Sequence, residues 1–132
     1  MALDQQHAAE TYKSLITISV EVFKALVLLN GGAVVALLAY LGQAANKSQV
    51  AAHARCPLAL FVAGLVSAGV AFGTSYMTQF ALYNESVLPE RYKGPRHEVF
   101  LWITVTFGIL SLALFSIGAF AGVAALSRYA AP

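Results

Sequence analysis

Long runs without a charged residue alternate with short charged stretches along this chain. Three such runs cover residues 25–46, 56–84 and 99–127, which are 22, 29 and 29 residues long. A membrane-spanning helix needs about 20 mostly apolar residues to cross a hydrocarbon core roughly 30 Å thick. Helices are favoured over strands because a helix satisfies its own backbone hydrogen bonds in lipid, and runs such as AVVALLAYLG do not alternate. The pattern predicts an all-α integral membrane protein with three transmembrane helices.

The spans are expected at about residues 25–45, 57–83 and 99–127 of a single membrane domain, residues 1–132. Pro57 is expected in the first turn of the second helix, where a missing N–H costs nothing. Pro89, Gly94 and Pro95 break the chain between the second and third spans. Both connections are too short to fold as separate domains.

The residues before the first span have two different faces. Polar residues recur at intervals of three and four, and apolar residues such as Leu15, Val22 and Phe23 lie on another face. This pattern predicts an amphipathic helix over about residues 5–24 that continues into the first span. It either packs on neighbouring helices at the membrane surface or serves as an interfacial anchor or oligomerisation helix. Glu21 and Lys24, one turn apart, are expected to form an interfacial ion pair; the alternative is a functional pair inside the membrane.

Composition narrows the function classes. The chain is 59% hydrophobic and 11% charged, whereas soluble domains carry about 25% charged residues. A net charge of +2 is too small to indicate nucleic acid as a partner. The single cysteine, Cys56, excludes a disulfide framework, and His7, His53 and His97 do not lie deep within a span, where a haem ligand is expected. We therefore expect no cofactor, no metal site and no catalytic residues, and hence no enzyme.

Charge distribution bears on orientation. The side that holds the N-terminus and the second connection carries five Lys and Arg residues and all six acidic residues, whereas the other side carries three Lys and Arg. The positive-inside rule counts only the basic residues and favours a cytoplasmic N-terminus. In size and hydropathy this three-span layout resembles that of small bacterial membrane proteins, including three-span holins, and the resemblance implies a bacterial inner membrane. The C-terminal SRYAAP departs from the charged tail common in holins.

Small residues recur at intervals of four in all three spans. Such rows let helix backbones approach closely, which is the main source of helix association in lipid. The partner is either another helix of this chain or a further subunit. The candidate helix-packing residues are Gly32, Ala36, Ala63, Ser67, Ala71, Gly118 and Gly122.

Polar residues within the spans gather toward the N-terminal side of the membrane. They either protrude into the headgroup region or line a polar vestibule above an apolar constriction, where a pore can close by dewetting. For Asn30 and Gln79 the alternative to lining is a hydrogen bond between helices, because a buried amide needs a partner. The candidate vestibule-lining residues are Asn30, Ser75, Gln79, Thr104 and Thr106.

These features support two hypotheses about function. The first is a small homo-oligomeric membrane protein that forms a pore or channel for ions or small solutes. The second is a non-catalytic accessory or anchor subunit of a larger membrane complex. A secondary transporter is disfavoured because no buried charge offers a coupling site and no duplicated half is visible. The expected partners are the lipid bilayer and further copies or other membrane subunits.

Overall fold

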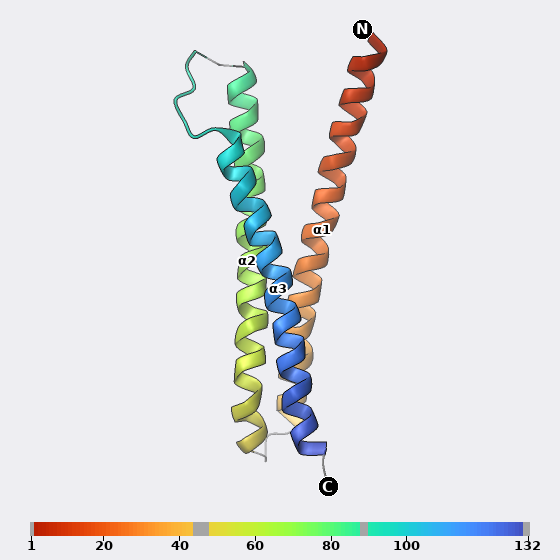
Figure 1. The fold of residues 1–132 in the computed structure, drawn as a ribbon, viewed down its shortest axis with the longest axis vertical. Helices are drawn as coiled ribbons and strands as arrows, with labels where there is room; N and C mark the ends of the chain where they lie inside the picture. Colours follow the sequence, from red (N-terminus) through yellow and green to blue (C-terminus); the bar gives the residue numbers. More distant parts are fainter. Residues whose placement is uncertain (1, 44–47, 88–89, 131–132) are drawn as a thin grey trace.

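The computed structural model describes residues 2–43, 48–87 and 90–130, and they form three long helices (Figure 1). Helix α1 covers Ala2–Gln43, α2 covers Ser48–Val87 and α3 covers His97–Ala130. Each helix contains a segment long and apolar enough to cross a membrane. The predicted class, an all-α membrane protein with three spans and an extended first helix, is confirmed.

Pro57 lies inside α2 and not in its first turn. The helix begins at Ser48, nine residues earlier. A proline within a helix removes one backbone hydrogen bond, and membrane helices tolerate this where a neighbouring helix packs on the site. Here Pro57 is buried, and its Cβ lies 4.0 Å from the position that a Cβ on Gly122 of α3 would occupy.

Helices α2 and α3 lie side by side along most of their length, whereas α1 contacts α2 less and α3 least. Small side chains allow this close approach. Ala68, Ala71 and Ala81 of α2 are completely buried. The Phe61 ring lies so close to Gly118 that a Cβ there would stand 2.9 Å from its Cε1 atom. Glycine at position 118 is therefore required for the ring to fit between the helices.

Helix α1 diverges from the α2–α3 pair toward its N-terminus (Figure 1). Toward the N-terminus, Asn30, Leu26 and Phe23 are the final buried residues of α1. Residues 4–22 beyond them are all exposed. The Phe23 ring meets Phe72 of α2 edge-on, with ring centroids 5.8 Å apart. Phe23 therefore marks the point at which the three helices separate.

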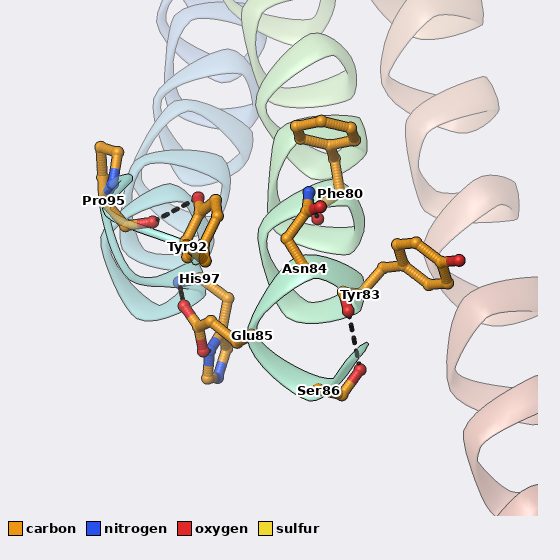
Figure 2. A network of polar contacts seen from close by, with 8 residues as sticks. All are labelled: Phe80, Tyr83, Asn84, Glu85, Ser86, Tyr92, Pro95 and His97. Atoms are coloured by element: carbon orange, nitrogen blue, oxygen red, sulfur yellow. Dashed lines mark hydrogen bonds and ion pairs between the residues drawn. The ribbon is translucent and has the colours of Figure 1, made fainter. Parts of the chain in front are cut away.

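The turn between α2 and α3 is closed by the side chain of Glu85 (Figure 2). Its Oε1 accepts a hydrogen bond of 2.8 Å from the backbone N–H of His97, and its Oε2 lies 2.7 Å from Nδ1 of the same residue. A carboxylate is favourable at this position because it neutralises the positive end of the α3 dipole. The Tyr92 hydroxyl donates to the Pro95 carbonyl at 2.9 Å and holds the turn from the other side.

Candidate functional site

A buried polar cluster joins the three helices at one level. Asn30 of α1 and Ser111 of α3 have no exposed surface. The Asn30 Nδ2 group donates to Ser111 Oγ at 3.1 Å and to the Leu26 carbonyl at 3.1 Å, and Ser111 Oγ donates to the Gly64 carbonyl of α2 at 2.8 Å. The Asn30 amide N–H groups and the Ser111 hydroxyl, the donors of this cluster, thus have acceptors within the protein.

The oxygen of the same amide faces glycine. Asn30 Oδ1 is buried and has no hydrogen-bond partner among the described residues. It occupies the space that a Cβ on Gly64 would need, and that Cβ would stand 2.7 Å from Asn30 Cγ. Glycine is thus required at position 64 for α1 and α2 to approach at this level.

Above this cluster, on the N-terminal side, α1 and the α2–α3 pair enclose an open cleft. One cavity of about 550 Å³ lies mainly between α1 and α2, and a second of about 410 Å³ lies between α1 and α3. Both are lined by Ser19, Phe23, Ser75, Thr78 and Gln79. The shared lining residues make them one continuous cleft, with Phe23, Leu26 and Leu112 at its floor.

Two of the polar groups that line both cavities keep hydrogen-bonding capacity. Gln79 Oε1 accepts a hydrogen bond from the Tyr12 hydroxyl across the cleft. Within the part of the chain that the structure describes, Gln79 Nε2 and the Ser75 hydroxyl make no hydrogen bond. Thr78 Oγ1, in contrast, donates to the Thr74 carbonyl of its own helix at 2.9 Å. The Gln79 amide and the Ser75 hydroxyl are therefore available to bind a polar molecule in either cavity.

The five candidate vestibule residues occupy three kinds of environment. Ser75 and Gln79 line both cavities, and Thr104 lines the second, where its Oγ1 lies 2.8 Å from Thr74 Oγ1. Asn30 lies below the cleft, where it forms the hydrogen bond between helices described above. Thr106 is exposed and lines neither cavity.

The candidate packing residues divide between buried and exposed positions. Ser67, Ala71 and Gly118 are buried, and Gly122 is half-buried beside Pro57. In contrast, Gly32, Ala36 and Ala63 are exposed, and a Cβ on Gly32 would meet no atom within 4 Å. These three positions are therefore not part of the core that the described helices share.

The Glu21–Lys24 pair is present, with Lys24 Nζ 2.7 Å from Glu21 Oε1. It lies on the face of α1 that points away from the cleft, and about two thirds of each side chain is exposed (64% for Glu21 and 61% for Lys24). Within the described ranges, no three His, Cys, Asp or Glu side chains come together as a metal ion would require.

Some residues of the site were not among the candidates. Ser111 and Gly64 complete the buried cluster, and Tyr12 bridges the cleft to Gln79. Nothing in the local pattern distinguishes Ser111 from Ser116, which donates to a carbonyl of its own helix. Only the relative register of the helices separates their roles.

No family model matches this chain, and no curated protein and no solved structure is significantly similar to it.

Proposed function

We propose that this protein is a small homo-oligomeric membrane protein that forms a pore for ions or small polar solutes, without catalysis. In this proposal the cleft between α1 and the α2–α3 pair is the mouth of the pathway. The floor at Phe23 and Leu26 is the apolar constriction that closes it.

The observation that carries the proposal is the pair of available polar groups inside a membrane-spanning segment. The Ser75 hydroxyl and the Gln79 amide line both cavities. A polar group without a partner costs several kcal/mol in hydrocarbon, on the order of 2–7 kcal/mol for an amide or hydroxyl. Water or a hydrated solute in the cleft would remove this cost.

Flux through reconstituted vesicles tests the proposal. We expect Gln79→Leu and Ser75→Ala to reduce the rate of ion release from vesicles that contain the purified protein. The matched control is Thr106→Val, since Thr106 is exposed and lines neither cavity. Flux that is absent in the wild type, or equal in all four proteins, would refute the proposed pathway.

The floor of the cleft gives a second test, in which the flux is expected to rise. Phe23 and Leu26 are 8% and 6% exposed, so shortening them opens the level at which the helices converge. Phe23→Ala is expected to raise the basal flux because a hydrophobic constriction gates by its width. An unchanged flux in Phe23→Ala would place the constriction elsewhere.

The second candidate function, an accessory subunit of a larger membrane complex, is favoured by the outer face of α2. Gly69 and Gly73 are exposed, and a Cβ on either would meet nothing within 4 Å. Two glycines four residues apart suit close packing of another helix. The mass of the chain purified alone in mild detergent separates the two functions: a discrete homo-oligomer supports the pore, and a monomer that associates only with other polypeptides supports the accessory role.

We also propose that the N-terminus is cytoplasmic and that the membrane is a bacterial inner membrane. The support is the five-to-three distribution of Lys and Arg between the two sides.

A further inference from the structure

The register of the helices places the Glu21–Lys24 pair deeper than its position in the sequence suggests. In the sequence the pair precedes the apolar run 25–46 and so belongs at the membrane surface. In the structure α1 is packed against α2, whose own apolar run extends from Arg55 to Glu85. The depth of the pair can therefore be measured along α2.

Helix α2 provides the scale. Arg55 and Glu85 are 30 residues apart in one helix, which corresponds to about 45 Å. A hydrocarbon core of about 30 Å placed anywhere between these two charges always covers the middle third of the interval. Phe72 lies about 26 Å from Arg55 along the axis, within that middle third. Phe23, between Glu21 and Lys24 in the chain, packs on Phe72 with ring centroids 5.8 Å apart.

The buried cluster gives the same depth on this scale from a second contact between α1 and α2. Asn30 packs against Gly64, which is about 14 Å from Arg55 along α2. Lys24 is six residues farther toward the N-terminal side, so it lies about 23 Å from the level of Arg55, and Glu21 about 27 Å. Both levels fall within the same middle third. With Arg55 and Glu85 both outside the hydrocarbon core, the pair therefore lies inside it.

Among the described residues, none buries this pair. Glu21 and Lys24 lie on the face of α1 opposite Phe23, Leu26 and Asn30, and the exposed fractions of their side chains are 64% and 61%. Lys24 Nζ donates to Glu21 Oε1, and in the described ranges neither side chain makes another hydrogen bond. Ionised groups that face lipid are costly, and in membrane proteins they almost always face a protein partner or a water-filled cavity.

The rest of the same face is apolar and equally exposed. Leu28 is 73% exposed and Val35 is 68% exposed, and Gly32 between them has open space around it. These residues follow Lys24 at intervals of three and four, so they continue one face of the helix. We call Glu21, Lys24, Leu28, Gly32 and Val35 the outer α1 face.

We infer that the outer α1 face is the contact between two copies of this chain, related by a two-fold axis along the membrane normal. In that arrangement each Glu21 faces Lys24 of the other copy as well as its own. The four charges then form a neutral, self-complementary group, as a two-fold interface requires. Gly32 lets the backbones approach directly below the charges. The inference rests on the proposed homo-oligomer and specifies its interface.

Cysteine cross-linking tests the contact. Cys56 is the chain's one cysteine, so Leu28→Cys in a Cys56→Ser background introduces a single thiol on the outer α1 face. The matched control is Val66→Cys in the same background, because Val66 is 62% exposed and lies at about the same depth on α2. We expect oxidation in membranes to give a disulfide-linked dimer for Leu28→Cys only. Equal cross-linking at both positions, or none at Leu28→Cys, would overturn the inference.

Charge variants test the complementarity. Glu21→Lys places four cations in the interface, and Lys24→Glu places four anions there. We expect the dissociation constant of the dimer to rise about tenfold or more in each variant alone. The two variants co-expressed should form a mixed dimer, because their charges are again opposite. Rescue by the partner copy cannot arise from a role within one chain, so restored dimer also shows that both variants fold. Failure of the mixed dimer to form would overturn the inference.

The mass of the wild-type protein in mild detergent separates this inference from the proposed function. A wild-type monomer refutes the homo-oligomer itself. A wild-type oligomer whose mass is unchanged in both charge variants refutes only the outer α1 face as its interface.

Discussion

Gly64→Ala is the substitution for which the structure makes the sharpest prediction. The new Cβ would overlap Asn30 Oδ1 and stand 2.7 Å from Asn30 Cγ, so either α1 moves away from α2 or the amide leaves its place. Overpacking of a close-packed site costs about 1–3 kcal/mol. Loss of the Asn30–Ser111 hydrogen bond adds about 0.6 kcal/mol, the average for such bonds in membranes. Alanine regains about 1 kcal/mol of helix propensity. The expected net loss of stability is therefore about 0.6–2.6 kcal/mol.

A double-mutant cycle isolates the overlap. Asn30→Ala removes the atoms that the new Cβ would meet, so Gly64→Ala should cost little or be stabilising in the Asn30→Ala background. We expect a coupling of about 1–3 kcal/mol between the two positions. The control is Gly69→Ala, since a Cβ at Gly69 meets nothing within 4 Å; that variant should be neutral or more stable.

The assay is SDS-induced unfolding in mild nonionic micelles, followed by pulse proteolysis. Protein concentration is held constant, because the stability of an oligomer depends on it. If the effects of Gly64→Ala and Asn30→Ala add within about 0.5 kcal/mol, or if Gly64→Ala behaves as Gly69→Ala does, the close approach of α1 and α2 at this level would be refuted.

Three further predictions follow from the packing of α2 and from its exposed cysteine. Gly118→Ala should lose about 1–2 kcal/mol of stability, because its Cβ would stand 2.9 Å from Phe61 Cε1. Gly108→Ala is the control, because a Cβ there has open space and should not destabilise the protein. Equal midpoints of SDS-induced unfolding in the two variants would contradict this prediction. Ser67→Ala should be tolerated and Ser67→Leu should disrupt the α2–α3 contact, since Ser67 is 5% exposed and its hydroxyl bonds only to its own helix in the described structure; a stable, unchanged Ser67→Leu protein would contradict it. Cys56 is exposed at the end of α2 opposite the N-terminal side, so a membrane-impermeant maleimide should label it from outside the cell if the N-terminus is cytoplasmic; labelling only after lysis would reverse the orientation.

The local pattern of charged and apolar residues was sufficient to predict the number of helices. The three charge-free runs predicted three spans because charged side chains are excluded from hydrocarbon and because an isolated chain in lipid must bond its own backbone. The extension of the first helix also followed from its polar and apolar faces. The start of α2 did not, since Pro57 favoured a helix that begins there, and packing against α3 instead keeps the proline inside the helix.

The candidate site depended on information that no single segment contains. From the sequence, Asn30 had two interpretations, lining and bonding between helices, and the sequence offered no reason to join it to Ser111, 81 residues away. The two residues meet because Gly64 lets α1 approach and because α3 is in register with both. Register between membrane helices is set by the sum of many close contacts among small residues, and hydropathy does not encode it.

The sequence by itself determined that this protein has three membrane helices, because the cost of charge and of unpaired backbone in lipid is a property of each segment alone. The tertiary structure decided where these segments stand relative to one another. It placed Asn30 in a buried cluster, opened a cleft above it that is lined by the Ser75 hydroxyl and the Gln79 amide, and turned the Glu21–Lys24 pair away from that cleft. These outcomes depend on which side chains of different helices fit together, and only the packed chain specifies that fit.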